Sequence, residues 1–365
     1  MKKLNLTLVL LLISALSYAG IITVDNHTGS GANYSTISSA VNAATNGDTI
    51  YIQPSTSSYG GFTLNKGLVF IGSGHKPEFT GGVGVIITVI SLANGSSNSQ
   101  FIGLILNQIK CNVWQTSNNI LIRNNFFKQY SSIGGAFGDA SESSDWIIEG
   151  NVFIEATGCG GCYVIDIKTG ATGVTNSNWI IRNNFIQSKS SQDNSSIFMN
   201  LNSSTVVENN IILHRNSSAI FNSNVVGGEI RNNIFWITQA SFTDVSLDAT
   251  NVVFSNNLTY HSNGSLIALS GDNNVDNSDP EFTLLDSSDP IWNYLNDYQL
   301  ISTSSGADAG EDGTDVGIYG GGYQFRMEGY PQNFPRFIDF DVLSNTVVPP
   351  GGTIEISINA TRAGL

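Results

Sequence analysis

The sequence is poor in cysteine, proline and charge. It has three cysteines and eight prolines in 365 residues, and Asp, Glu, Lys and Arg together make up only 12%. Asn, Ser, Gly and Thr are abundant, and hydrophobic residues reach 41%, which is enough for a continuous core. This composition is typical of a solenoid of short strands and tight turns rather than of a disordered chain.

Long hydrophobic runs are missing beyond the start of the chain. Residues 1–19 combine Lys2 and Lys3, an apolar run from Leu6 to Leu16 and the small-residue site Ser17-Tyr18-Ala19. The run is too short to span a bilayer. The pattern therefore predicts a signal peptide and an exported, soluble mature protein without a membrane span.

The scarce cysteines leave few choices for cross-links or metal sites. Cys159 and Cys162 form the motif Cys-Gly-Gly-Cys, and in an exported protein we expect a small-loop disulfide rather than a redox or metal site. A zinc site would need two more ligands. Cys111 is the other cysteine, and we expect it to be a buried, small apolar residue.

Positive charge is also in short supply. The formal net charge is −14, and removal of the two signal-peptide lysines makes it −16, which disfavours nucleic acid as a partner. From Asp244 to Asp315 there are 13 acidic residues and no Lys or Arg. Such a region repels acidic glycans and attracts cations. Its cluster Asp308, Glu311, Asp312 and Asp315 does not have EF-hand spacing, so a solvated acidic turn is favoured over a Ca²⁺ site.

What the chain does have is a repeated phrase: a short apolar strand, a charged residue, then two asparagines. The first example is Ile120-Leu121-Ile122-Arg123-Asn124-Asn125. The second asparagine falls at positions 125, 151, 184, 210, 233 and 257, in steps of 26, 33, 26, 23 and 24 residues. A period in the twenties indicates a solenoid.

The asparagine pairs predict the kind of solenoid. Asparagine tolerates the left-handed backbone region, so a pair between two apolar runs suits a tight bend from one strand to the next. When that bend recurs once per coil, side-chain amides stack at about 4.8 Å, where donors meet acceptors. The sequence therefore predicts a parallel β-helix with an asparagine ladder.

Two further columns support this register. The charged column alternates in sign along what we expect to be an outward-facing row, in which exposed pairs contribute about 0.2–1 kcal/mol each. One residue earlier lies an apolar column that we expect to form the core. The charged column is Arg123, Glu149, Arg182, Glu208, Arg231 and Ser255; the apolar column is Ile122, Ile148, Ile181, Val207, Ile230 and Phe254.

A short helix is predicted before the first coil. Ile37, Ala40, Val41 and Ala44 have the spacing of an amphipathic helix, with Ser35 as the expected N-cap and Asn46-Gly47 as the stop. A helix across the open end of a solenoid hides unpaired strand edges.

The helix and the segments 47–54, 59–61 and 68–74 resemble the N-terminal cap and first coil of secreted bacterial right-handed β-helix proteins of the pectate-lyase-like superfamily. The segments 279–282, 297–300, 306–310 and 315–320 resemble the closing part of the same group, so the resemblance covers about residues 30–322. It implies a right-handed coil and a three-sheet prism. The superfamily includes pectate, alginate and chondroitin lyases, polygalacturonases, and many surface proteins with no known catalysis.

The predicted fold is thus all-β, a right-handed parallel β-helix with a short N-terminal capping helix and a β-rich C-terminal tail. We expect a signal peptide at 1–19, the β-helix domain at 20–325, and at 326–365 a linker and the start of an immunoglobulin-like sandwich. The tail contains Val347-Val348-Pro349-Pro350-Gly351-Gly352 followed by alternating strand residues.

In the resembled enzymes, substrate lies along one outer sheet, on the strands that precede the asparagine bends. Alternation places two outward rows on the corresponding segments here, and their amides and carboxylates suit hydrogen bonding to sugar hydroxyls. The first row is Asp166, Asn200, Asn222 and Ser246; the second is Lys168, Asn202, Asn224 and Asp248.

Two reaction types place different demands on these residues. A glycosidase needs two carboxylates about 5–9.5 Å apart, but Asp166 and Asp248 lie three coils apart, about 14 Å. If Asp139 lies one coil from Asp166, this pair meets the distance. A lyase needs a base and a group that neutralises the uronate, for which we expect Lys168 as base and Asp139 and Asp166 as Ca²⁺ ligands. If the protein is an enzyme, we favour a polysaccharide lyase over a glycoside hydrolase.

Two functions remain open. The first is a secreted protein that interacts with an extracellular polysaccharide. A finer form of this hypothesis is that the protein is a polysaccharide lyase. The second is a non-catalytic cell-surface module, structural or adhesive, with further extracellular domains as partners.

Overall fold

The computed structural model describes residues 19–112, 114–135, 142–154, 163–167, 176–188, 196–222, 224–242, 244, 249, 251–263, 267–285, 291–331, 335–342, 353 and 356–362. Most of the predicted signal peptide, the Cys159 and Cys162 pair, and the candidate residues Asp139, Lys168, Ser246 and Asp248 lie outside these ranges.

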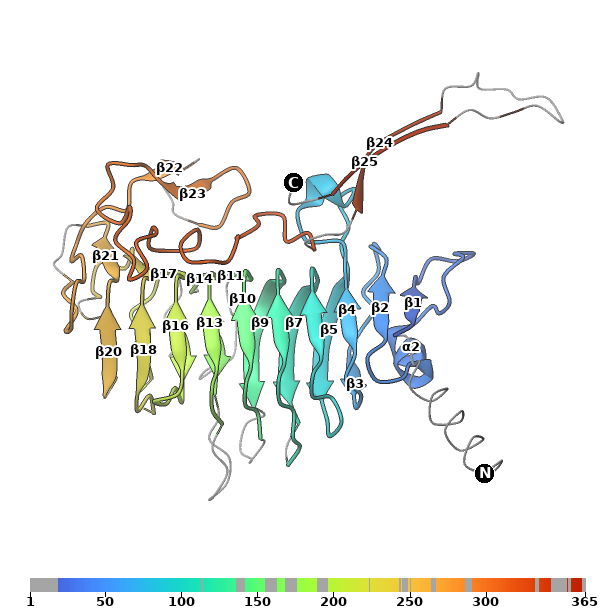
Figure 1. The fold of residues 1–365 in the computed structure, drawn as a ribbon, viewed down its shortest axis with the longest axis horizontal. Coiled ribbons are helices and arrows are strands. Elements are labelled where there is room, and N and C mark those ends of the chain that lie inside the picture. Colours follow the sequence, from blue (N-terminus) through green and yellow to red (C-terminus); the bar gives the residue numbers. More distant parts are fainter. Residues whose placement is uncertain are drawn as a thin grey trace, which may run out of the picture.

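The chain forms a parallel β-helix, which confirms the predicted architecture (Figure 1). Successive coils add parallel strands to a ten-stranded sheet, called sheet 1, and to an eleven-stranded sheet, called sheet 2. Sheet 1 runs β1 (Ile21–Val24), β2 (Thr49–Ile52), β4 (Val69–Ile71), β6 (Gln100–Ile102), β8 (Leu121–Arg123), β10 (Ile147–Glu149), β13 (Ile180–Arg182), β16 (Val206–Glu208), β18 (Gly228–Arg231) and β20 (Val252–Ser255).

A strand of sheet 2 follows each asparagine bend. The main path of sheet 2 is β3 (Phe62–Leu64), β5 (Ile86–Leu92), β7 (Ile105–Cys111), β9 (Phe126–Gly135), β11 (Val152–Ile154), β14 (Phe185–Gln187), β17 (Ile211–His214), β19 (Ile234–Ile237) and β21 (Leu258–His261). The short strands β12 (Ile165–Asp166) and β15 (Phe198–Met199) continue the far half of β9. We call this far part, residues 89–92, 108–111, 132–135, β12, β15 and Phe221, the third face.

The two asparagines of each pair have separate roles. The first adopts the left-handed conformation, with φ of 56° at Asn124, 49° at Asn183 and 54° at Asn209. The second points inward and joins a continuous ladder, in which the Nδ2 of Asn151 donates to the Oδ1 of Asn184 at 3.0 Å. The predicted ladder is confirmed from 125 to 257, and Asn274 adds one more rung at 3.1 Å.

The inner row forms the core as expected. Ile122, Ile148, Ile181, Val207 and Ile230 have no exposed surface. Aromatic side chains stack from coil to coil in the same core, with ring centroids 4.6 Å apart for Trp146 and Trp179 and 4.5 Å apart for Phe127 and Phe153. Cys111 is buried, as predicted.

The capping helix α2 (Ile37–Ala43) covers the first coil, and Ile37, Ala40 and Val41 are buried. The expected N-cap at Ser35 is wrong by one residue. Thr36 is the N-cap, because its side chain accepts a hydrogen bond from the amide of Ser39 at 3.2 Å. The ammonium of Lys66 binds the backbone oxygens of Val41, Asn42 and Ala44, which are acceptors at the helix end.

A long C-terminal segment, residues 291–331, runs back along the β-helix, and we call it the strap. In Figure 1 it is the orange to red chain that returns along the upper ends of the strands from β20 toward β4. Near its start lies an antiparallel pair, β22 (Phe282–Leu284) and β23 (Asp297–Leu300). Trp292, Tyr298, Val316 and Ile318 of the strap pack on the apolar outer surface of sheet 2 in a second hydrophobic cluster.

The strap also binds the first asparagine of several bends. Asn183 donates to the backbone oxygens of Ile318 and Gly320, at 3.0 and 2.8 Å, and Asn256 donates to that of Ala309. The hydroxyl of Tyr323 donates to the Oδ1 of Asn124. At Gly150, which replaces the first asparagine, a Cβ atom would clash with that hydroxyl, so the crossing of the strap accounts for the glycine.

The charged column is less exposed than the sequence suggested. Glu149 has no exposed surface and is paired with both Arg123 and Arg182, while Arg231 pairs with Glu208 at 2.9 Å. The expectation of a fully exposed row is therefore wrong at Glu149, because the strap covers this part of sheet 1's edge and the Tyr323 ring lies over Arg123.

The chain stays packed on the β-helix as far as Tyr330, which is buried. Beyond it, β24 (Pro335–Val342) and β25 (Ile356–Arg362) form an antiparallel pair that projects away from the β-helix in Figure 1. Ile356 and Ile358 are exposed on this pair.

Candidate functional site

The predicted polysaccharide strip lies on the third face, and the structure brings part of it together. β12 and β15 are neighbours, and the Nδ2 of Asn200 donates to the Oδ1 of Asp166 at 2.6 Å. The register differs from the predicted row, because Asp166 lies opposite Met199 rather than Asn200. Asn200 has φ of 59° and is buried, so its side chain turns back toward Asp166.

Asn222 extends this group by one coil. Phe198 forms a bridge with Phe221, which puts Met199 and Asn222 side by side in the next position. The Nδ2 of Asn222 lies 3.5 Å from the hydroxyl of Tyr163, a residue that the sequence did not single out. Partial burial, and then the charge of Asp166, raise the pKa of the Tyr163 hydroxyl.

We call Tyr163, Asp166, Asn200 and Asn222 the Asp166 cluster. It offers a neutral phenol, a carboxylate and two amides across three coils, and these groups both donate and accept hydrogen bonds. A row of mixed donors and acceptors about 4.8 Å apart can bind successive hydroxyl groups of an extended chain.

The second predicted row has a different role. The amide of Asn202 donates to the backbone oxygen of Asn176 at 2.6 Å and accepts from Ser204, so it closes a turn. The backbone amide of Asn224 donates to Asn222 at 3.0 Å in a second turn. Asn224 itself is exposed, while the other two members of the row lie outside the described residues.

The register reveals a cation that the sequence analysis missed. Ser91, Lys110, Gly134 and Asp166 occupy one position on four successive coils. Lys110 is half-buried, and it forms no ion pair within the described ranges. Gly134 leaves no side chain between Lys110 and Asp166. The sequence does carry a signal for this position of Lys110. The segments Ile109-Lys110-Cys111 and Ile165-Asp166-Ile167 share an apolar–polar–apolar pattern, and aligning them places Lys110 in the row of Asp166.

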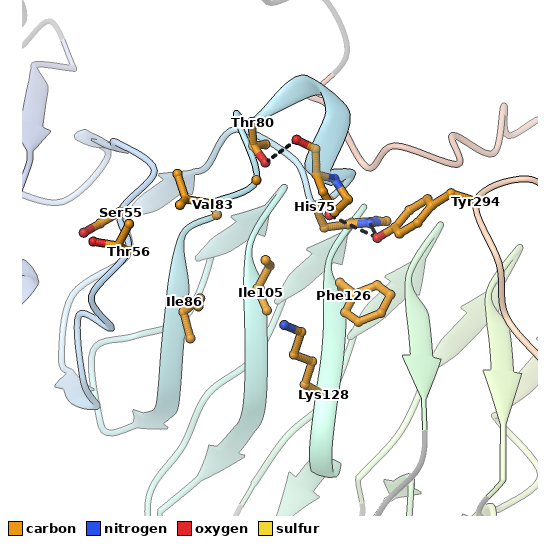
Figure 2. A pocket seen from close by; sticks show the side chains of 13 residues that line it. Ser55, Thr56, His75, Thr80, Val83, Ile86, Ile105, Phe126, Lys128 and Tyr294 are labelled. Carbon is orange, nitrogen blue, oxygen red and sulfur yellow. Dashed lines mark hydrogen bonds between the residues drawn. The ribbon is translucent and has the colours of Figure 1, made fainter.

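A separate pocket of about 330 Å³ opens on the outer surface of sheet 2 near its N-terminal end (Figure 2). Its apolar floor is one row of three neighbouring strands, Ile86 of β5, Ile105 of β7 and Phe126 of β9. Figure 2 shows the Lys128 ammonium pointing toward this floor from below and Tyr294 of the strap closing one side. Lys128 is exposed, and the part of the chain that is described gives it no ion-pair partner.

His75 forms the wall between this pocket and the strap. Its Nδ1 lies 2.7 Å from the hydroxyl of Tyr294, and that hydroxyl also donates to the backbone oxygen of His75 at 3.0 Å. The imidazole is 4% exposed, and burial lowers its pKa to about 3. His75 is therefore uncharged at neutral pH, and its role is to hold the strap through Tyr294 rather than to bind a ligand as a cation.

The described residues contain no group of three or more His, Cys, Asp or Glu side chains placed to hold a metal ion. In the acidic cluster of the strap, Asp312 accepts from Thr314, Asp315 accepts from the amide of Asp308, and Glu311 pairs with Arg231 at 3.1 Å. These carboxylates hold a turn and an arginine. Asp139 lies outside the described residues, so calcium binding with Asp166 stays a prediction.

Neither a protein-family model nor a curated protein matches this chain. Within the described ranges, no helix has the length and apolar character required to cross a membrane.

Proposed function

We propose that this protein is exported and binds an extracellular polysaccharide along the third face. The observation that carries the proposal is the contact of Asp166 with Asn200, together with Tyr163 and Asn222 beside them on the adjoining coils. Polar groups repeated at coil spacing suit a ligand that itself repeats, and a polysaccharide extended along the β-helix axis is such a ligand.

The distribution of charge favours the third face, which lies between residues 89 and 221, over the C-terminal coils as the binding region. Residues 20–243 contain ten basic and twelve acidic side chains, whereas residues 244–315 contain 13 acidic and no basic ones. An acidic polysaccharide is therefore repelled from the C-terminal coils and attracted to Lys110. The affinity for a neutral polysaccharide would not depend on this charge distribution. Added salt should therefore weaken the binding of an acidic polysaccharide and leave that of a neutral one unchanged.

Lyase activity is the finer proposal. It needs a base near the proton beside a uronate carboxylate, and a cation that neutralises that carboxylate. Lys168 is the candidate base, Asp139 and Asp166 are the candidate Ca²⁺ ligands, and Lys110 is a further cation in the row of Asp166. The polar contacts of the Asp166 cluster support binding more directly than they support any reaction.

The test is an array of acidic and neutral polysaccharides incubated with the mature protein, with and without Ca²⁺. Retention of a polysaccharide would support binding, and new ultraviolet absorbance from unsaturated uronates would support the lyase. Absence of both would contradict the proposal and favour a structural or adhesive module.

Variants locate the binding surface. We expect Lys110→Ala and the double variant Asp166→Ala with Lys168→Ala each to weaken binding at least about tenfold, or about 1.4 kcal/mol. Glu229→Ala is the control, because Glu229 is an exposed acidic residue of sheet 1. Equal affinities of all these variants, measured by titration calorimetry, would show that the third face is not the binding surface.

A further inference from the structure

Trp114 combines two features that are unfavourable for stability. Its side chain is 64% exposed, whereas the other four tryptophans, at positions 146, 179, 236 and 292, are buried. Its backbone has φ of 60°, in the left-handed region that bulky residues rarely adopt. Backbone strain of this kind persists where the surroundings enforce it, and it is concentrated at binding sites.

The surroundings do enforce it. The amide of Gln115 donates to the backbone oxygen of Asn112 at 3.2 Å, which closes a tight turn around Trp114. The neighbouring coil clamps the end of that turn, since Asn94 exchanges hydrogen bonds with the Gln115 side chain at 3.0 Å and with the amide of Thr116 at 2.7 Å. The turn is therefore fixed at its base while the indole projects into solvent.

The turn directly follows the third face. Lys110 and Cys111 are the last residues of β7, so only Asn112 and one further residue separate the strand from Trp114. Thr116, just beyond, bonds to the carboxylate of Glu142 on the next coil. The exposed indole therefore stands on a turn whose described residues Asn112, Gln115 and Thr116 are polar, at the edge of the proposed binding face.

We propose that Trp114 is a stacking platform for a pyranose ring of the bound polysaccharide; this inference rests on the proposed function and assigns one of its contact residues. A pyranose has an apolar face of C–H groups that packs on an indole, and hydroxyl groups at its edge that bond to amides and carboxylates. Trp114 and its polar neighbours provide both kinds of contact. A protein partner would be expected to need an apolar patch around the indole, and the adjacent described residues are polar.

Because Trp114 is the exposed tryptophan among five, fluorescence reports on it directly. Iodide should quench the Trp114 emission and leave the buried tryptophans largely unquenched. Cellohexaose and hexagalacturonate are the soluble probes, together with any polysaccharide retained on the array. We expect a bound glycan to protect Trp114 from iodide.

Two variants separate stacking from folding. Trp114→Gly removes the ring and accepts the left-handed backbone, so its melting temperature should equal or exceed that of the wild type while glycan affinity falls about tenfold or more. Trp114→Phe keeps an aromatic surface and should retain most of the affinity. Leu295→Ala is the control for loss of an exposed apolar side chain, because Leu295 is an exposed residue of the strap, and its glycan affinity should equal that of the wild type.

The outcomes distinguish this inference from the proposed function. If no glycan binds the wild type, both fail. Suppose instead that a glycan binds the wild type and Trp114→Gly equally well and leaves the iodide quenching of wild-type Trp114 unchanged. In that case the assignment of Trp114 as a stacking platform is wrong, and the proposed function stands. If Trp114→Gly instead abolishes self-association seen by light scattering and leaves glycan affinity unchanged, the indole serves a protein interface and the platform is again wrong.

Discussion

At the scale of single residues, the asparagine ladder shows how one side chain satisfies a whole bend. The Oδ1 of Asn184 accepts from both the backbone amide and the side chain of Asn151, and its Nδ2 donates to Asn210 and to the backbone oxygen of Ile148. All four bonds are buried. Glutamine is too long for this geometry and aspartate cannot donate, so the repeat requires asparagine.

We expect Asn184→Ala to lower the free energy of unfolding by about 3 kcal/mol or more, because it leaves buried donors and acceptors on three neighbouring residues without partners. Urea unfolding followed by circular dichroism measures this loss. Asn42→Ala is the matched control, since Asn42 is an exposed residue of α2, and its change should stay within about 0.5 kcal/mol. Equal effects of the two substitutions would refute a structural role for the ladder.

Among the structural elements, the strap covers part of the charged column and so changes the environment of Glu149. Glu149 lies between two arginines of adjacent strands, with the Nε of Arg123 at 2.6 Å and the Nε of Arg182 at 2.8 Å. Its burial converts an ordinary surface pair into a desolvated one, in which loss of the carboxylate leaves two guanidinium groups uncompensated.

Glu149→Gln should therefore destabilise the protein by about 2–4 kcal/mol, measured by thermal or urea unfolding. Glu229→Gln provides the comparison, because Glu229 is mostly exposed and lies 3.4 Å from Arg231. Glu229→Gln should lower the free energy of unfolding by less than about 1 kcal/mol, and this loss should become smaller as the salt concentration rises. A Glu149→Gln protein as stable as the wild type would mean that the strap does not isolate this carboxylate from water.

At the scale of the whole molecule, buried histidines link the fold to pH. Burial lowers the pKa of His75 to about 3 and that of His214 to about 4, although the backbone oxygen of Ser218 opposes the second shift. His75 faces Tyr294 and Phe126, and His214 faces Phe242. Both histidines take up protons more readily in the unfolded chain, whose ordinary pKa is about 6.5.

Stability should therefore be full above about pH 6.5 and fall as the pH drops toward 4, with each histidine contributing about 2–3 kcal/mol of the loss at pH 4.5. Urea midpoints at pH 7 and pH 4.5 measure it. The double variant His75→Asn with His214→Asn should show a smaller difference between the two pH values than the wild type. An unchanged difference would place the acid sensitivity elsewhere, for example in Asp25 and Asp48, whose pKa values are lowered by backbone hydrogen bonds.

Local sequence patterns were enough to predict the coil. Alternation of apolar and polar residues, and the preference of asparagine for left-handed bends, are local properties that recur in every repeat, so strands, inner row and ladder were predictable. Asn274 was missed because the last step shortens to 17 residues. The shift at Asn200 was also missed, because one left-handed residue turns a side chain out of its row.

Which surfaces are covered and which stay open depends instead on long-range packing. The strap joins residues far apart in the chain, such as His75 with Tyr294 and Asn124 with Tyr330. Its Tyr294 closes one side of the pocket, and its Tyr323 covers Arg123 and Gly150 beside the buried Glu149. The alignment of Lys110 with Asp166 likewise depends on coils of unequal length. Such contacts arise from the summed geometry of many coils, and no local pattern in the sequence carries that information.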